Sequence, residues 1–105
     1  MASQKKLIRA KFRASVFDRD GFKCRMCGHK PEGVSELDAH HITDRNLIIN
    51  GGYVPENGIA LCCECHIKAE QFHKDGEAYP GYTPEDLYKE ISSNYIIAVE
   101  ASKRL

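Results

Sequence analysis

Apolar side chains near the start of the chain recur at the spacing of a helix. Leu7 and Ile8 are followed by Phe12 and Val16 at steps of four residues, with charged side chains between them. This pattern predicts an amphipathic helix over residues 4–18, with a polar face that is mostly basic. The pair Asp20-Gly21 marks its end.

Residues 37–43 follow a different pattern, because a period of two residues replaces the period of a helix. Such alternation predicts a strand. Its two faces would carry Leu37, Ala39, His41 and Thr43 on one side and Asp38, His40 and Ile42 on the other. Proline and glycine signals predict loops over residues 31–35 and 44–56, followed by a short second strand over residues 58–61.

Three further helices are predicted in the second half of the chain. The first covers about residues 63–72 and is closed by Asp75-Gly76. The next begins at the capping sequence Thr83-Pro84-Glu85-Asp86 and reaches about residue 91, and the last covers about residues 94–103. The order predicts an α+β fold in one domain, residues 1–105. It comprises a basic N-terminal helix (1–20), a core (21–75) and a C-terminal helical extension (76–105).

Composition narrows the class of protein. The 105 residues include 15 Lys+Arg and 15 Asp+Glu, so this is not a basic protein that coats nucleic acid by charge alone. No apolar run approaches the roughly 20 residues that span a bilayer, and no apolar segment follows the Lys-rich start. We therefore expect a cytoplasmic protein with no membrane partner. The charges are nevertheless segregated, because residues 1–30 carry a net +7. That end suits a polyanion, although a merely solvated helix would look the same.

Four of the five cysteines form two Cys-x-x-Cys pairs, which are Cys24 with Cys27 and Cys62 with Cys65. Each pair suits a turn in which two thiolates reach one zinc ion, and Gly28 allows the left-handed turn after the first. Together they predict a structural zinc site that contributes about 10 kcal/mol to folding. Cys63 could replace Cys62, but the symmetric spacing favours Cys62. Disulfides or free thiols are the alternatives, and the odd cysteine count disfavours disulfides.

Three histidines lie between or beside these pairs. His40 and His41 are adjacent on the predicted strand, so their side chains point to opposite faces, and His66 follows Cys65. Zinc would hold the strand near the helix, so one of the pair could hold a second metal with His66 while the other faces a substrate. Phosphodiester hydrolysis uses a divalent metal and a neutral imidazole base in this way. Ordinary core or surface histidines are the simpler interpretation, which the neighbouring cysteine pairs disfavour.

The order and spacing of these motifs resemble the HNH, or ββα-metal, endonucleases, in their branch with a four-cysteine zinc site. The resemblance covers residues 13–73 and rests on six runs: Arg19-Asp20-Gly21, Cys24-x-x-Cys27-Gly28, Leu37-Asp38-Ala39-His40-His41-Ile42, Gly51-Gly52, Asn57 and Leu61-Cys62-x-x-Cys65-His66. It implies a strand–strand–helix motif with two zinc knuckles, flanked by helices. It also implies a metal-dependent DNA endonuclease or nickase.

The resemblance implies a role for each matching residue. His41 would be the general base that activates water, and Asn57 would orient it through hydrogen bonds. His40 and His66 would hold the catalytic divalent metal, while Cys24, Cys27, Cys62 and Cys65 bind structural zinc. Mg²⁺ or Mn²⁺ is the expected catalytic ion in the cell, and imidazole ligands would also accept Ni²⁺ or Zn²⁺ in vitro.

One position departs from the family pattern. Some relatives have a further histidine ligand four residues after the helix histidine, and this chain has Glu70 there. Glu70 could be a ligand, a carboxylate that holds the His66 ring, or a solvated charge paired with Lys74. We favour the last two.

Contacts with DNA would come from outside the short motif. The candidates are basic side chains on the N-terminal helix and after the first strand, namely Lys5, Lys6, Arg9, Lys11, Arg13 and Arg45. Phosphate contacts carry no sequence information, so we expect weak sequence preference. The apolar residues 95–99 leave open a homodimer, and a larger phage or restriction assembly is a further option. The alternative function is a non-catalytic zinc-stabilised module that binds nucleic acid or protein. The joint presence of His40, His41, Asn57 and His66 favours the enzyme.

Overall fold

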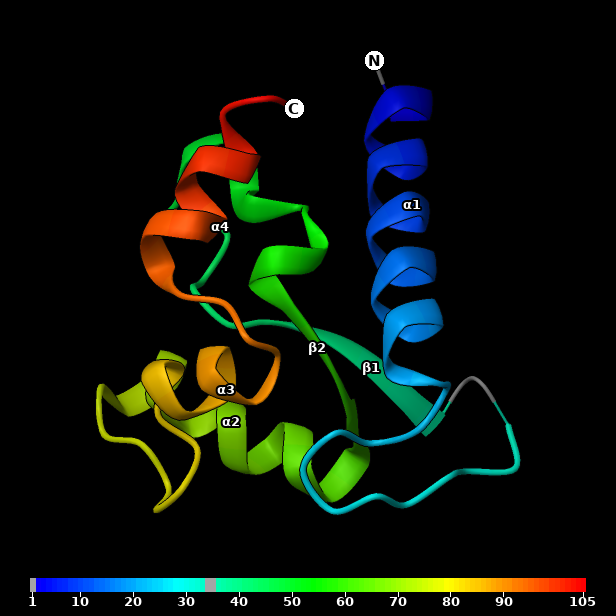
Figure 1. Cartoon of the computed structure of the whole chain (residues 1–105), viewed down its shortest axis with the longest axis vertical. Helices are drawn as coiled ribbons and strands as arrows, with labels where there is room; N and C mark the ends of the chain where they lie inside the picture. Colours follow the sequence, from blue (N-terminus) through cyan, green and yellow to red (C-terminus); the bar gives the residue numbers. More distant parts are fainter. Residues whose placement is uncertain (1, 34–35) are drawn as a thin grey trace.

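An antiparallel pair of strands forms the centre of the structure. The computed structural model describes residues 2–33 and 36–105, with side chains from residue 5 onward. Its elements are α1 (Ala2–Asp20), β1 (Leu37–His41), η2 (Ile49–Gly52), η3 (Pro55–Asn57), β2 (Gly58–Cys62), α2 (Cys63–Asp75), α3 (Pro84–Glu90) and α4 (Tyr95–Ser102), where η is a short 3-10 helix. Figure 1 shows α1 on one side of the strands, α3 and α4 on the other, and α2 across the end of β2. The predicted α+β class is confirmed.

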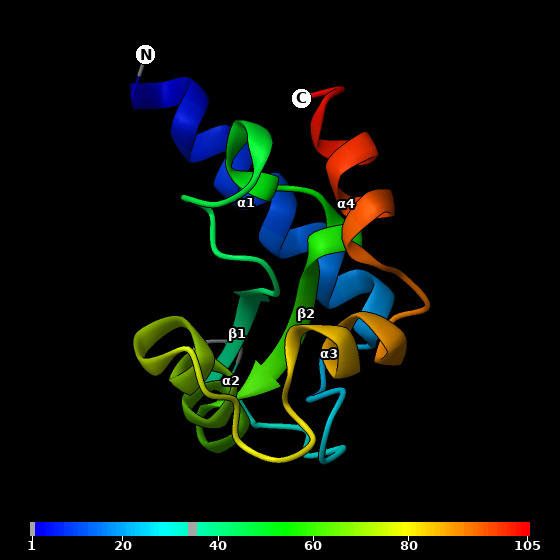
Figure 2. The same ribbon diagram turned by 90° about the vertical axis from the view of Figure 1, so that its left-hand side faces the viewer.

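Both faces of the strand pair are covered. β1 and β2 pair with His40 opposite Ile59 and His41 opposite Gly58. α1 covers one face in a cluster of Phe12, Val16, Phe17, Leu37 and Ala60. The other face packs against α2, α3 and α4 in a cluster that includes Ile42, Ile59, Leu61, Ala69, Leu87 and Ala98. Every residue of β2 is therefore buried. In Figure 2, α2 and α3 lie at the same end of the strands, and both termini lie at the opposite end.

A buried carboxylate fixes α1 to the strands. The Asp20 side chain is fully buried and accepts a hydrogen bond from the Ala60 backbone N–H at 2.9 Å. The Arg19 guanidinium donates to both Asp20 oxygens, at 2.7 and 2.8 Å, and also to the Gly58 carbonyl at 2.7 Å. Arg25, from the first cysteine pair, lies 3.4 Å from the same carboxylate. α1, β2 and the first cysteine pair therefore meet at the Asp20 carboxylate. Two arginines balance its charge, and a backbone N–H donates a hydrogen bond to it.

α1 approaches β2 closely at a glycine. A Cβ atom at Gly58 would lie 2.6 Å from Val16 Cγ2 and 2.7 Å from Phe12 Cε1, so only glycine lets the helix pack at this distance. Because Gly58 pairs with His41, this contact also brings Phe12 beside the end of β1.

Most predicted boundaries are confirmed to within a few residues. Thr83 forms the predicted capping box with Asp86, and α2 ends at Gly76 in a left-handed conformation. β1 is shorter than predicted, because the Asn57 N–H turns back to the Val54 carbonyl and the Thr43 N–H bonds to the Asn57 side chain instead of continuing the ladder. The predicted loop over residues 44–56 contains η2 and most of η3, and the predicted loop over 31–35 ends in residues outside the described part of the chain.

Among the described residues, no helix combines the length and apolar character required to cross a membrane.

Candidate metal and catalytic sites

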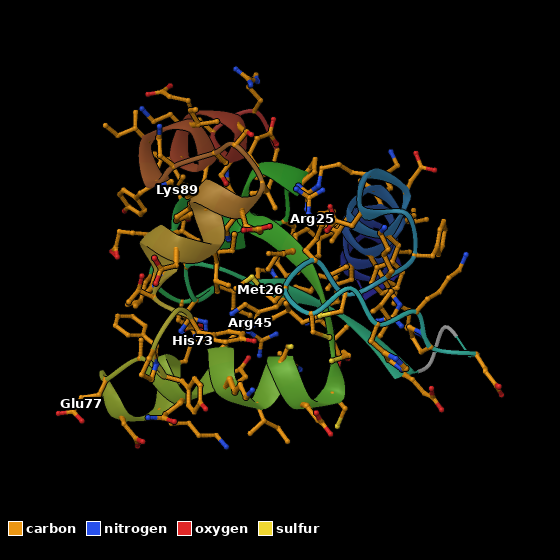
Figure 3. All side chains as sticks on the ribbon, turned by 60° about the horizontal axis from the view of Figure 1, so that its bottom comes forward. Arg25, Met26, Arg45, His73, Glu77 and Lys89 are labelled. Atoms are coloured by element: carbon orange, nitrogen blue, oxygen red, sulfur yellow. The ribbon has the colours of Figure 1, made fainter. Side chains whose placement is uncertain are left out.

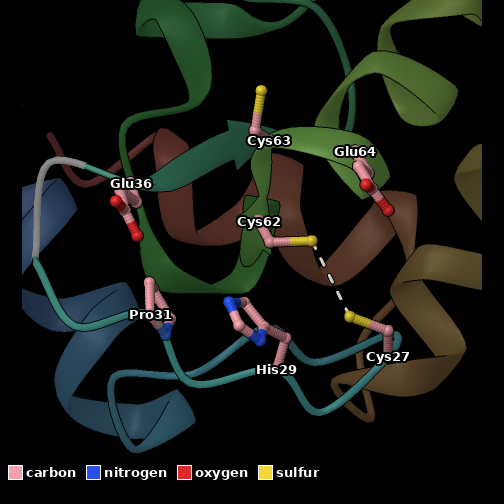
Figure 4. A pocket seen from close by; sticks show the side chains of 7 residues that line it. All are labelled: Cys27, His29, Pro31, Glu36, Cys62, Cys63 and Glu64. Atoms are coloured by element: carbon pink, nitrogen blue, oxygen red, sulfur yellow. Dashed lines mark hydrogen bonds between the residues drawn. The ribbon is translucent and has the colours of Figure 1, made fainter.

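The four paired cysteines form one cluster. The sulfur atoms of Cys24, Cys27, Cys62 and Cys65 all lie within 4.8 Å of one another, and Cys27 Sγ is 3.7 Å from Cys62 Sγ. A tetrahedral zinc ion with Zn–S bonds of about 2.3 Å would separate its sulfurs by about 3.8 Å, so the cluster fits zinc. Figure 4 shows the Cys27–Cys62 contact, with the Cys63 sulfur directed away from it. The structure thus places Cys62, rather than the exposed Cys63, in the cluster.

Backbone and side-chain hydrogen bonds support this cluster. Gly28 has a positive φ of 80°, and its N–H donates to the Cys24 carbonyl at 2.9 Å, which closes the predicted turn. The Tyr82 hydroxyl donates to Cys65 Sγ at 3.2 Å. The bond ties the segment before α3 to the cysteine cluster, and hydrogen bonds from outside a ligand set commonly support metal ligands in this way.

A second cluster lies where β1 faces α2. His66, Glu70 and His73 occupy positions i, i+4 and i+7 of α2, so they share one helix face. His40 points from β1 onto this face. His40, Glu70 and His73 each offer a ligand atom within 4.8 Å of the others. His66 joins the group through its Nε2, which lies 3.2 Å from Glu70 Oε1.

His40 is the buried member of this cluster. It is 2% exposed, and neither ring nitrogen has a hydrogen-bond partner among the described residues. Its closest polar approach is from Nδ1 to Glu70 Oε1, at 3.4 Å. Burial lowers the pKa of His40 and so favours the neutral imidazole, which is the form that binds metals. Because buried polar atoms rarely lack partners, a divalent cation fits this donor set.

Glu70 supplies negative charge to the same place. The close approach of the His40 ring lowers the pKa of Glu70 to about 2, against the opposing effect of burial, and the charges of His73 and His66 add to the lowering. Glu70 is therefore ionised at neutral pH. Of the interpretations considered for this residue, the structure shows contact with the His66 ring, together with a contact to His40.

Two further contacts orient the histidines. Asp38 Oδ2 lies 3.1 Å from His66 Nδ1, and His73 Nε2 lies 3.0 Å from the His41 carbonyl oxygen. The His40 and His73 rings are stacked with centroids 5.1 Å apart. A carboxylate or carbonyl that fixes one ring nitrogen is a common support for a histidine ligand.

His41 lies on the opposite face of β1, as its alternation with His40 predicts. Its ring stacks on Phe12 at 4.5 Å between centroids and meets the edge of Tyr53 at 4.7 Å. Its Nε2 is buried without a hydrogen-bond partner in the described part of the chain. Burial, helped by the nearby His40 and Arg45, lowers the pKa of His41 to about 4. At neutral pH the ring is therefore uncharged and able to accept a proton.

Asn57 ties the end of β1 to the following loop and to α3. The side chain is fully buried, and its Oδ1 accepts hydrogen bonds from the Thr43 N–H at 2.9 Å and from the Tyr88 hydroxyl at 2.6 Å. Its Nδ2 donates to the carbonyls of Thr43 and Gly52, at 3.1 and 3.2 Å. Two of the four bonds hold the backbone of Thr43, which lies two residues after His41. Asn57 thus occupies a tethering position, although it does not contact the His41 ring itself.

A basic groove runs beside these histidines, between α1 and the segment after β1. Lys5, Arg9, Arg45, Asn46, Asn50 and Tyr53 line it, and no acidic side chain is among its described lining residues. Arg45 also lines the pocket that contains His40, His41, His66, Glu70 and His73, and Figure 3 shows Arg45 and His73 near one another over α2. Burial acts to raise the pKa of the Tyr53 phenol, but hydrogen bonds from Arg45 and Arg9 lower it overall.

The structure does not bring all the predicted basic residues to this groove. Lys6 and Lys11 are exposed elsewhere on α1. Arg13 donates a hydrogen bond to the Leu37 carbonyl at 3.0 Å and lies over the Phe17 ring, so it takes part in packing α1 onto β1.

Residues of these sites that sequence reasoning missed include Asp38, His73 and Tyr88. The i+4 and i+7 steps from His66 could have indicated His73. Asp38 shares a strand face with His40, and this placement indicated a site residue less strongly than the helical spacing of His73 did. Tyr88 comes from a distant helix, and no local pattern connects it with Asn57.

Comparison with known families gives a match to part of the chain. The model of the family described as HNH endonuclease matches residues 24–72, which contain both cysteine pairs, His40, His41, Asn57 and His66. The comparisons with curated proteins and with solved structures found no significant match.

Proposed function

Because the HNH endonuclease family model matches residues 24–72, we propose that this chain is a metal-dependent endonuclease or nickase that hydrolyses phosphodiester bonds of DNA. One observation carries the proposal: His40, His66 and Glu70 converge on the α2 side of β1, and they line one pocket together with His41, whose ring is neutral. A module that only binds a partner needs the cysteine cluster for stability. It has no need of a buried histidine with two unpartnered nitrogens beside a carboxylate.

In this proposal His41 takes the proton from the attacking water. Phe12 and Tyr53 hold its ring from two sides, and its low pKa keeps it unprotonated at neutral pH. Asn57 keeps the end of β1 in place through its bonds to Thr43. A divalent metal at His40 and His66 would stabilise negative charge on the phosphate and on the leaving oxygen.

Arg45, Arg9 and Lys5 position the substrate backbone. Arg45 lines both the pocket that contains the histidines and the basic groove. A DNA strand with one phosphate near His41 could therefore place its next phosphates along the groove. Such contacts give affinity without sequence selectivity, which agrees with the expected weak sequence preference.

The test uses zinc-loaded protein and supercoiled plasmid, with Mn²⁺, Mg²⁺, Ni²⁺ or EDTA in parallel. The proposal predicts open circles with at least one of the metals and none with EDTA. A preparation that shifts the plasmid on a gel but does not cut it in the presence of any of the metals would contradict the proposal. That result would favour the alternative, a non-catalytic module that binds nucleic acid.

A further inference from the structure

We propose that His73 is an additional ligand of the catalytic metal, so that the site offers an imidazole beyond those of His40 and His66, together with the Glu70 carboxylate. This inference rests on the proposed function and concerns the cofactor of that same site. His73 lies one residue beyond the segment that the family model matches, and the structure groups it with His40 and Glu70.

Two contacts place His73 in the site. One of its ring nitrogens lies within 4.8 Å of the ligand atoms of both His40 and Glu70. Its ring stacks on that of His40 with an interplanar angle of 23°. His40 has no hydrogen-bond partner at either nitrogen among the described residues, although it is 2% exposed. The cluster therefore contains a buried donor atom that lacks a partner and lies within reach of the His73 ring.

The backbone sets the orientation and the tautomer of His73. The His41 carbonyl oxygen can only accept, so His73 Nε2 must carry the hydrogen of their 3.0 Å contact. A neutral ring that is protonated at Nε2 keeps its lone pair on Nδ1. Coordination would thus occur through Nδ1, and the Nε2–H bond would hold the ring as outer hydrogen bonds hold other histidine ligands. The same bond links this ligand to the backbone of His41.

The donor set has a consequence for the choice of metal. Mg²⁺ favours oxygen ligands and retains several waters, whereas imidazole favours first-row transition ions. A site with several imidazoles and one carboxylate should therefore take Mn²⁺ or a later transition ion in preference to Mg²⁺. Our sequence-based expectation of Mg²⁺ or Mn²⁺ becomes, on this inference, an expectation of Mn²⁺.

The test measures Mn²⁺ binding without DNA. Protein that holds one zinc per chain is titrated with Mn²⁺, and free Mn²⁺ is followed by its electron paramagnetic resonance signal. The variants are His73→Gln and, as a matched control, His29→Gln. His29 is exposed and is the histidine that belongs neither to the cluster at α2 nor to the surroundings of His41. We expect His73→Gln to weaken Mn²⁺ binding by about 10- to 100-fold and His29→Gln to leave it unchanged. Unchanged zinc content and far-ultraviolet circular dichroism show that each variant is folded.

A second measurement uses the wild-type protein alone and so does not depend on the variant folding. Electron spin-echo spectra of bound Mn²⁺ should show coupling to more than two imidazole nitrogens, and a tenfold excess of Mg²⁺ should not displace the ion. Coupling to two nitrogens or fewer, or equal Mn²⁺ affinity in wild type and His73→Gln, would overturn the inference. His73 would then only donate to His41. Intact Mn²⁺ binding in a protein that cuts no plasmid would instead count against the proposed function alone.

Discussion

The hydroxyl of Tyr88 offers a sharp test of how α3 supports the site. Tyr88 is 4% exposed, and its hydroxyl donates to Asn57 Oδ1 at 2.6 Å. Since that hydrogen is used, the Thr43 hydroxyl must donate to Tyr88 in their 2.7 Å contact. Tyr88→Phe removes both bonds and keeps the ring in place.

The magnitude follows from the groups left behind. Asn57 Oδ1 still accepts from the Thr43 N–H, and the Thr43 hydroxyl lines a surface pocket where water can replace its partner. No buried group is orphaned, so each lost bond costs about 1 kcal/mol and Tyr88→Phe should lower the free energy of unfolding by about 2 kcal/mol. Tyr95→Phe, at a residue that is 50% exposed, should change it by less than about 0.5 kcal/mol.

The assay is urea unfolding of the zinc-saturated protein, with Thr43→Val and the double variant completing a cycle. Because Thr43 and Tyr88 share a bond, the double variant should lose less stability than the two single variants added together. If Tyr88→Phe costs no more than Tyr95→Phe, or if the two losses are additive, the hydroxyl does not support Asn57 as described.

Three further predictions concern the cysteines, His41 and the basic groove. Cys62→Ser should abolish the one structural zinc per chain, measured by elemental analysis, whereas Cys63→Ser should retain it; zinc loss in Cys63→Ser would contradict the assigned cluster. The pKa of His41 is about 4 in the folded protein and near 6.5 in the unfolded chain, so the unfolded chain binds more protons between these values. The stability difference between wild type and His41→Gln should therefore fall as pH decreases from 7 to 4.5, and a constant difference would show that His41 titrates normally. Arg9→Gln and Arg45→Gln should each reduce the salt dependence of DNA binding by about one unit of slope, whereas Lys89→Gln on α3 should not; equal slopes in all three would remove the groove from the interface.

The sequence predicts those parts of the site whose spacing is local. The two cysteine pairs, the opposite faces of His40 and His41, and the place of His66 after Cys65 follow from steps of one to three residues along a strand or turn. Contacts between distant segments were beyond such reasoning. Phe12 reaches His41 because α1 packs against Gly58, and Tyr88 reaches Asn57 because α3 closes the second core cluster. Neither contact has a signature in residue spacing.

Glu70 and Arg13 show why charge alone is an incomplete guide. Arg13 was assigned to contacts with DNA, and a solvated charge was one of the two favoured interpretations of Glu70, since charged side chains on helices are usually solvated. In the structure Glu70 turns towards His40 and His66, and Arg13 bonds to the Leu37 carbonyl. The helix faces that bear them are covered by β1, and the position of that strand was not fixed by either helix sequence.

One pair of rate constants decides whether His41 is the base of the proposed metal-dependent nuclease. Conversion of supercoiled plasmid to open circles is measured with saturating Mn²⁺ for wild type and for His41→Ala, after equal Mn²⁺ affinity has been verified. A positioned general base contributes about 10²- to 10⁴-fold, so we expect a rate at least about 100-fold lower for the variant. Equal rates, within a factor of about three, would contradict this role of His41, because the proton of the attacking water would then have another acceptor.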